Sequence, residues 1–338
     1  MAGFAAVGMY VLDLSTRPPS NDVEAFLMRR KEKHLVVRQE KEERTLVCLG
    51  DSLTHGKGSS NWVDRIVPQF ISTLQNKTSV VVTTTTENSN NHDKPLSLSV
   101  VNCGQNNMIT EVALKERVDW VLDCQPNYVV VLLGTNDCRG LVDKGWKNQL
   151  EYMWWTQKPL SLETLETNLR GIVTKLLSTS TADGNGNSIP VLQRKVALCT
   201  LPPMSEQLNE KPNQLIRHVN KTIIAKIAQE HKDRCTLLDI YTALETKIRQ
   251  ESRNHDNKLP VGMVTVLGPA FAFAHCCMGY STNRLSNMIG NVVLSDGLHL
   301  NDAGGNVVCD LVVDFLTKQE EERQTTPPPP QDTAKKQQ

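Results

Sequence analysis

Short apolar segments alternate along the chain with longer segments of helical period. The short segments are rich in β-branched and other apolar residues, the composition of strands buried on both faces; they span 45–49, 96–101, 128–133, 195–200 and 236–240. In the longer segments apolar residues recur every three or four positions, which predicts amphipathic helices; these span 62–75, 110–123, 162–177, 213–232 and 302–317. The alternation predicts an α/β fold in which helices cover both faces of a parallel sheet.

Polar or irregular segments divide the chain into one domain with appendages. Residues 1–44 form an N-terminal extension whose charged second half predicts a helix or an extended arm. The domain spans 45–318 and carries insertions near 77–95 and 249–293, the first polar and the second unusually apolar. The proline- and glutamine-rich tail 319–338 is expected to be disordered, because it cannot bury enough apolar surface to fold.

Composition narrows the classes of function. Lysine plus arginine and aspartate plus glutamate both total 37, so the chain lacks the net positive charge expected of a nucleic-acid-binding protein. No stretch reaches the ~18 uninterrupted apolar residues of a membrane helix, which predicts no integral membrane segment and leaves transient contact with a membrane surface open. The N-terminus lacks the basic start of a signal peptide. Nine cysteines, several in apolar runs, favour buried reduced thiols, and together these features predict a cytoplasmic protein.

Three short motifs carry the candidate chemistry, and the first two directly follow predicted strands. They read Gly-Asp-Ser-Leu-Thr at 50–54, Gly-Thr-Asn-Asp at 134–137 and Asp-Gly-Leu-His at 296–299. The carboxyl ends of parallel strands form the edge at which open α/β sheets bind ligands. We therefore expect the motifs to meet at that edge.

The residues of these motifs are those that nucleophilic catalysis by serine requires. A serine hydroxyl becomes a good nucleophile when a neighbouring base removes its proton, and histidine suits that role because its pKa lies near neutrality. We predict Ser52 as the nucleophile, His299 as the base, and Asp296 as the carboxylate that orients the imidazole and stabilises its charged form. The oxyanion needs hydrogen-bond donors, for which the Ser52 N–H and the side-chain amide of Asn136 are candidates.

Each motif also has a purely structural interpretation. Ser52 suits a turn or a helix N-cap, Asp296 and the glycine after it form a common turn pair, and Asn136 suits a helix cap. The catalytic interpretation is favoured because all three motifs occur in one chain, in the order that the mechanism requires.

In combination, the motifs resemble the sequence blocks of the GDSL or SGNH hydrolase family. Thr-Leu-Pro-Pro at 200–203 also resembles the intervening strand end of bacterial-type members, and the resemblance covers roughly 45–316 apart from the insertions. It implies a flavodoxin-like three-layer α/β/α sandwich, the SGNH hydrolase fold. It also implies Ser52 as the nucleophile and hydrolysis of esters or thioesters with no metal and no cofactor.

One block departs from the family pattern Asn-x-Gly-x-x-Gly, whose second glycine supplies an N–H to the oxyanion. Here the segment 102–107 reads Asn-Cys-Gly-Gln-Asn-Asn, so Asn107 takes the donor position. Only a backbone N–H is needed, and asparagine tolerates positive φ better than most residues, so we expect the donor to be kept. Gly104 is the less favoured alternative donor.

The expected activity is that of a GDSL-type esterase or lipase, which hydrolyses carboxylic esters through an acyl-serine. Its substrate is a small-molecule ester or a lipid, with lipid, acyl-sugar and small acyl esters all open, and the oligomeric state is not determined. An acyltransferase that uses the same acyl-serine is the alternative. A non-catalytic binding domain is disfavoured, because Ser52, Asp296 and His299 are all present. The apolar segment 261–278 is either a lid that contacts the acyl chain or a structural cover for an edge strand.

Overall fold

The computed structural model describes residues 21–34, 42–77, 96–178, 194–251, 270–271, 273–275 and 277–325. Within them, parallel strands form one sheet in the order β2-β1-β3-β4-β5. The strands are β1 (Glu42–Gly50), β2 (Leu96–Gly104), β3 (Tyr128–Leu132), β4 (Lys195–Cys199) and β5 (Cys235–Leu238). The strand order reverses between β1 and β3. In doubly wound sheets, ligands bind at the carboxyl ends of the two strands where this reversal occurs.

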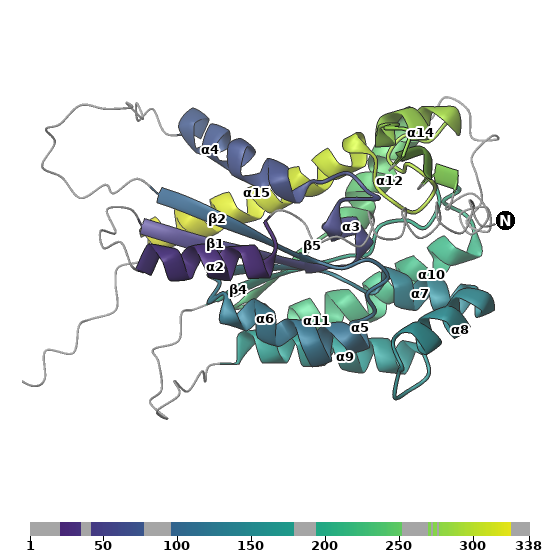
Figure 1. Ribbon diagram of the computed structural model, residues 1–338, viewed down its shortest axis with the longest axis horizontal. Helices are drawn as coiled ribbons and strands as arrows, with labels where there is room; N and C mark the ends of the chain where they lie inside the picture. The colour runs from purple at the N-terminus through teal and green to yellow at the C-terminus, as the bar shows by residue number, and fades with distance from the viewer. Residues whose placement is uncertain are drawn as a thin grey trace, which may run out of the picture.

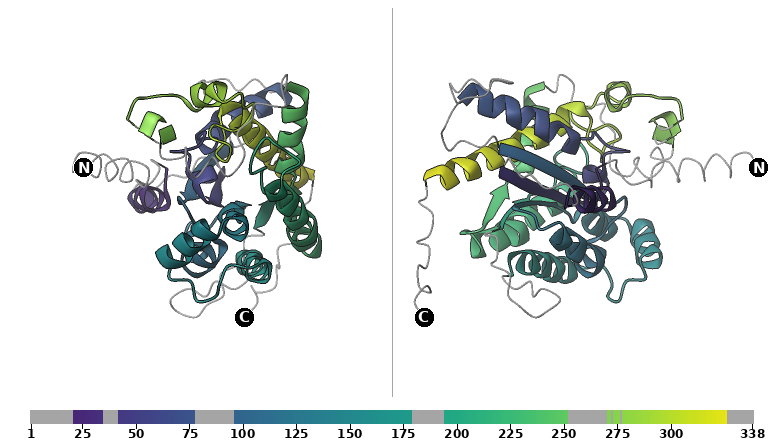
Figure 2. Two further views of the ribbon diagram at one scale, coloured as in Figure 1. Left: turned by 90° about the vertical axis from the view of Figure 1, so that its right-hand side faces the viewer. Right: turned by 60° about the vertical axis from the view of Figure 1, so that its left-hand side comes forward.

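Helices form a layer on each face of the sheet (Figures 1 and 2). The upper layer in Figure 1 contains α4 (Ile66–Lys77), α12 (Ile240–Glu251), α14 (Thr282–Met288) and α15 (Asp302–Thr325). The lower layer contains α5 (Thr110–Val112), α6 (Val118–Asp123), α7 (Thr135–Val142), α8 (Lys144–Met153), α9 (Leu162–Leu177), α10 (Lys211–Val219) and α11 (Ala225–Glu230). The predicted three-layer α/β/α fold is confirmed.

Strand β3 shows why a central strand of this sheet consists of an unbroken run of apolar residues. Val129 and Val131 pack into the cluster beneath α9, whereas Val130 and Leu132 pack into the cluster beneath α4 and α15. Each of these side chains is fully buried. Because side chains alternate between the two faces of a strand and helices cover both faces, every position must be apolar.

Several helices lie in segments for which the sequence predicts no element. Helix α7 follows directly after β3, α8 follows α7, and α12 follows β5. The first turn of α7 buries polar side chains, among them Asn136 and Asp137, where an ordinary surface helix would bury an apolar stripe. The helical period of apolar residues is therefore missing from this segment, and its sequence resembles a turn.

The closing helix α15 continues to Thr325 rather than ending at 317, and so enters the segment 319–338 that the sequence assigns to a disordered tail. Glu320 is buried within this extension and accepts hydrogen bonds from the Arg44 guanidinium, at 3.2 Å, and from the Tyr128 hydroxyl. A charged last turn is thus stabilised by partners far away in sequence, which local hydropathy does not reveal. Residues 326–338 lie outside the described residues.

The appendages are described only in part. In the N-terminal extension, α2 (Val23–His34) lies beside β2 and buries Val23 and Phe26 in the core. The polar insertion 77–95 lies, apart from its first residue, outside the described residues, and most of the segment 261–278 does too, so the lid stays a prediction. No helix in the described part of the chain is long and apolar enough to cross a membrane.

Candidate active site

Ser52 stands at the carboxyl end of β1, on a sharp turn into the short helix α3 (Ser52–His55). The turn needs glycine at position 50, since a Cβ there would lie 2.0 Å from the Thr54 Oγ1 and 2.8 Å from the Leu132 carbonyl oxygen. Asp51 caps α3 by accepting a hydrogen bond of 2.9 Å from the Leu53 N–H. The strand and the cap together present the Ser52 hydroxyl at the sheet edge.

The structure brings Ser52, His299 and Asp296 into one chain of contacts. The Ser52 Oγ lies 3.0 Å from the His299 Nε2, and the His299 Nδ1 lies 2.7 Å from the Asp296 Oδ2. The other Asp296 oxygen accepts the N–H groups of Leu298 and His299, at 2.9 and 2.8 Å. The carboxylate is therefore held by the turn that carries the imidazole, and the imidazole bridges it to the serine.

The electrostatics of this pair favour a charged imidazole beside a charged carboxylate. Burial alone lowers the pKa of His299, but the charge and hydrogen bond of Asp296, with a smaller contribution from Asp51, raise it above its ordinary value. Arg139 opposes this rise. Burial raises the pKa of Asp296, yet the facing His299 outweighs burial and lowers it. The site is thus arranged to stabilise the imidazolium that forms when a base accepts a proton.

The loop that carries Asp296 and His299 is closed at its base and tied to the segment after the nucleophile. Leu294 and Leu300 form an antiparallel bridge across the base. The Leu300 N–H donates to the Ser59 Oγ at 3.0 Å, and the Ser60 N–H donates to the Leu300 carbonyl at 2.8 Å. These bonds fix the position of the His299 loop relative to the chain that leads away from Ser52.

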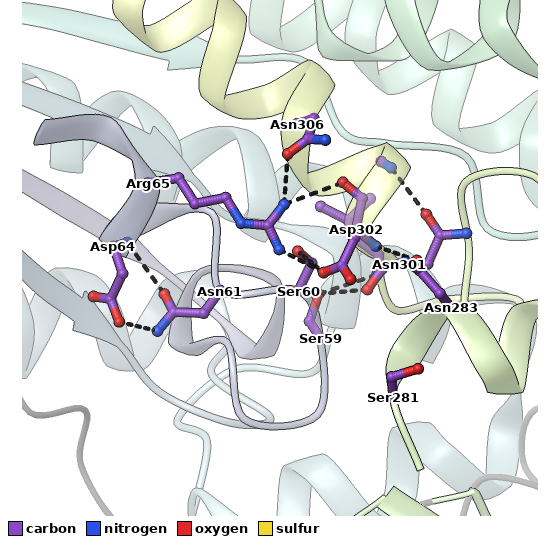
Figure 3. Close-up of polar contacts among 12 residues, drawn as sticks. Ser59, Ser60, Asn61, Asp64, Arg65, Ser281, Asn283, Asn301, Asp302 and Asn306 are labelled. Carbon is purple, nitrogen blue, oxygen red and sulfur yellow. Dashed lines mark hydrogen bonds and ion pairs between the residues drawn. The ribbon is translucent and has the colours of Figure 1, made fainter. Parts of the chain in front are cut away.

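A second group of contacts, shown in Figure 3, continues this connection into the start of α15. The carboxylate of Asp302 accepts hydrogen bonds from the Ser60 hydroxyl and the Arg65 guanidinium. The backbone N–H of Asp302 donates to the Asn283 side chain at 3.0 Å. Arg65 also donates to the Asn306 side chain. Sequence reasoning missed these residues, because polar residues beside a turn form no distinguishing pattern.

Of the three candidate oxyanion donors, Ser52 follows β1, Asn107 lies in the turn after β2, and Asn136 lies in the first turn of α7, after β3. Asn136 is 3% exposed and its Nδ2 donates to the Met108 carbonyl at 3.1 Å, which leaves its second amide hydrogen for another acceptor. Asn107, next to Met108, has a φ of 61°, the left-handed conformation that asparagine tolerates. The Trp154 indole donates to the Asn107 carbonyl at 2.9 Å and fixes that peptide. Asn107 and Asn136 therefore belong to one hydrogen-bonded unit.

Gly104 has a different part in the structure. Its N–H donates to the Asn102 Oδ1 at 2.9 Å, and the Asn102 amide donates in turn to the Thr54 carbonyl at 2.9 Å. A Cβ at position 104 would lie 2.3 Å from the backbone nitrogen of His55. Glycine is needed here for the close approach of β2 to α3, and its engaged N–H speaks against the alternative in which Gly104 supplies the oxyanion donor.

Two buried carboxyl groups flank the site. Burial raises the pKa of Asp51 to about 7, in opposition to its hydrogen bond from Leu53 and the nearby charge of His299. Burial also raises the pKa of Asp137 to about 6, although the Thr110 hydroxyl and N–H donate to it and lower the value. Asp137 thus holds Thr110, the first residue of α5, three residues after Asn107. Among the described residues, no group of three His, Cys, Asp or Glu side chains is placed to hold a metal ion.

Among solved structures, the chain is similar to several esterases at low sequence identity. An acetyl-xylooligosaccharide esterase variant, Axe2 from Geobacillus stearothermophilus, is 14% identical and has a TM-score of 0.50, with 82% of this chain and 95% of that chain covered. The acetyl xylan esterase AlAXEase is 16% identical, with a TM-score of 0.48 and coverage of 80% and 99%. A lipase/acylhydrolase from Enterococcus faecalis is 17% identical, with a TM-score of 0.43 and coverage of 82% and 96%. At this identity the Axe2 likeness concerns the fold alone.

The curated proteins contain no match to the sequence. By contrast, the model of the GDSL-like Lipase/Acylhydrolase family matches residues 48–306. That range includes all three motifs, strands β2 to β5 and the last three residues of β1. With most of its length matched, the chain belongs to the GDSL-like lipase/acylhydrolase family.

Proposed function

We propose that the protein hydrolyses carboxylic esters through an acyl intermediate on Ser52, with His299 as general base and Asp296 as its orienting carboxylate. The observation that carries the proposal is the continuous contact from the Ser52 Oγ to the His299 Nε2, 3.0 Å, and from the His299 Nδ1 to the Asp296 Oδ2, 2.7 Å. Membership of the acylhydrolase family supports the same reaction class.

In the first half of the reaction, the Ser52 Oγ attacks the ester carbonyl while His299 takes the hydroxyl proton on Nε2. Asp296 stabilises the imidazolium, and the oxyanion is bound by the N–H groups of Ser52 and Asn107 and by the Asn136 amide. Collapse of this intermediate breaks the ester bond, and His299 returns the proton to the leaving alcohol. Water, activated by the same imidazole, then releases the acid and regenerates Ser52.

The experiment that tests this proposal combines turnover with labelling. Purified protein is assayed with p-nitrophenyl esters of increasing acyl length and is treated with a fluorophosphonate, whose adduct is located by peptide mass spectrometry. We expect turnover of at least one ester and a single adduct on Ser52, which heat-denatured protein does not form. An adduct on another residue, or no hydrolysis of any ester, would contradict the proposal. Product analysis with added alcohol separates hydrolysis from acyl transfer, because both use the same acyl-serine.

Removal of the Asn136 amide tests the oxyanion assignment. Asn136→Ala is expected to lower kcat by about 10²–10³-fold with little change in KM, because the lost bond strengthens only in the transition state. Asn107→Gly is the matched variant: it keeps the backbone N–H, and glycine accepts the φ of 61° without strain. Steady-state kinetics should therefore show near-normal kcat for Asn107→Gly. A severe loss there would show that its side chain, and not its N–H, is required.

The pH dependence of the reaction reports the state of His299. Only the neutral imidazole accepts the Ser52 proton, so kcat/KM is expected to fall as pH drops through the His299 pKa. Asp296 raises this pKa above the ordinary value of 6.5. The acid limb should therefore have its midpoint above 6.5, measured with an ester whose own ionisation lies outside the range. A midpoint at or below 6.5 would mean that Asp296 does not stabilise the charged form in the free enzyme.

A further inference from the structure

Glu206 is a buried carboxylate on the loop between β4 and α10, on the opposite side of the His299 loop from Ser59. It is 2% exposed. Its Oε1 accepts the N–H groups of Val292, Val293 and Leu294 at 2.8, 2.6 and 3.0 Å, and its Oε2 accepts the Val292 N–H at 2.9 Å. Consecutive backbone N–H groups thus converge on a single side chain far away in sequence.

The segment that Glu206 binds is the incoming side of the His299 loop. Leu294 is its last residue before Ser295 and Asp296, and Leu294 bridges to Leu300 on the outgoing side. Val293 and Leu294 are fully buried, so water cannot replace the carboxylate as acceptor for their N–H groups. The position of Asp296, and with it the direction of the imidazole, therefore depends on an anchor outside the loop.

The loop that carries Glu206 is itself held rigidly. The Asn213 side chain accepts the Met204 N–H at 2.9 Å and donates to the Ser205 carbonyl, also at 2.9 Å. Ser205 has a φ of 132°, a conformation that residues with a Cβ rarely adopt. Such strain persists only where the surrounding structure enforces it, and it concentrates at functional sites. Here it directs the next residue, Glu206, toward the His299 loop.

We propose that Glu206 is a positioning residue, whose carboxylate holds the loop of Asp296 and His299 in line with Ser52. The proposal rests on the proposed roles of those three residues. It gives Glu206 no contact with the substrate: its task is to keep the His299 Nε2 within hydrogen-bonding distance of the Ser52 Oγ. Catalytic groups must be held within about 0.5 Å of their productive geometry. The last N–H that Glu206 accepts is that of Leu294, two residues before Asp296.

The first test compares Glu206→Ala with Glu210→Ala, which lies later in the same loop. Glu210 makes no capping hydrogen bond to α10 through its side chain, so its loss removes charge without removing the anchor. Glu206→Ala is expected to lower kcat by about 10–100-fold, the effect of misplacing a reacting group, with KM nearly unchanged. Glu210→Ala should behave as wild type. A kcat for Glu206→Ala within twofold of wild type would overturn the proposal.

A double-mutant comparison separates positioning from general destabilisation. If Glu206 acts only through the imidazole, Glu206→Ala should cause no further loss of fluorophosphonate labelling in a His299→Ala background, because groups that act as a unit are not additive. A full additional loss in that background would overturn the proposal. Ser52→Ala is measured in parallel: if it stays active, the proposed function itself fails, whereas an inactive Ser52→Ala with an unaffected Glu206→Ala rejects only the positioning role.

The acid limb of the pH profile gives a readout that a merely structural role would not move. The charged groups that act on His299 are Asp296 in its own loop, Asp51 beside Ser52, and Arg139 on α7. The contact between Asp296 and His299 raises the pKa of the imidazole. A loosened loop weakens this contact and lowers that pKa, so the acid limb should move to lower pH in Glu206→Ala. An unmoved limb together with a lowered kcat would contradict the proposal.

The conservative variant decides the question should Glu206→Ala not fold. In Glu206→Gln the amide oxygen can still accept the N–H groups of Val292, Val293 and Leu294. The amide nitrogen replaces Oε2, and it faces the Val292 N–H without being able to accept its second hydrogen bond. We expect a folded protein with kcat lowered about three- to tenfold, between wild type and Glu206→Ala. Wild-type kcat in Glu206→Gln, with Glu210→Gln as control, would show that the second carboxylate oxygen has no part in positioning.

Discussion

Ser52→Ala is expected to lower kcat for ester hydrolysis by about 10⁵–10⁶-fold, the loss found when a serine hydrolase loses its nucleophile. The reason is that no acyl-enzyme can form, and only the oxyanion donors and substrate binding remain to accelerate direct attack by water. The fold should stay intact, since the hydrogen bond that the Ser52 hydroxyl makes with His299 spans loops that are also tied through Leu300. Turnover of a p-nitrophenyl ester measures the loss of kcat, and the melting temperature measures whether the fold is intact.

Ser72→Ala provides the matched control, because Ser72 is an exposed serine on α4, outside the site. It should leave turnover, fluorophosphonate labelling and melting temperature unchanged. If Ser52→Ala kept turnover within tenfold of wild type, the nucleophile would have to be another group and the proposed mechanism would be wrong. A melting temperature well below that of wild type would instead show that the Ser52–His299 bond has a larger structural role than the geometry suggests.

Asp296→Asn is expected to lower kcat by about 10⁴-fold, as the same change does in other serine hydrolases. The amide oxygen can keep the hydrogen bonds from the N–H groups of Leu298 and His299, so the turn is retained. Its NH₂ group, however, then faces the His299 Nδ1, which must become an acceptor. The ring proton moves to Nε2, where it blocks acceptance of the Ser52 proton. The loss therefore comes from the wrong tautomer rather than from a broken loop.

Two measurements distinguish the tautomer effect from unfolding. Circular dichroism and thermal melting of Asp296→Asn should resemble those of wild type, while fluorophosphonate labelling of Ser52 slows by a factor similar to that for kcat. Asp296→Ala removes the anchor of the turn as well, so it should be both inactive and less stable. An Asp296→Asn protein with kcat within tenfold of wild type would show that the carboxylate is not needed to set the imidazole, and Asp296 would lose its proposed role.

The sequence by itself was sufficient to predict the layers of the fold and to single out the candidate site residues. The strand 128–132 reads as an unbroken apolar run because helices cover both of its faces, and that requirement acts on each position independently of its distant partners. Ser52, Asn136 and His299 stand in short motifs whose local chemistry is recognisable without coordinates. The motif order, together with the rule that strand ends meet at one sheet edge, places them in a single site before any distance is known.

Only the tertiary structure decided which groups hold that site together. Glu206 and Ser59 contact opposite sides of the base of the His299 loop, yet each is separated from it by more than eighty residues, and no periodic pattern marks either of them. The need for glycine at position 104 likewise follows from the close approach of the His55 backbone, which cannot be predicted from the residues next to Gly104 in sequence. Periodicity and motifs report what a residue needs from its immediate neighbours, whereas hydrogen bonds between distant loops depend on how the whole sheet brings those loops together.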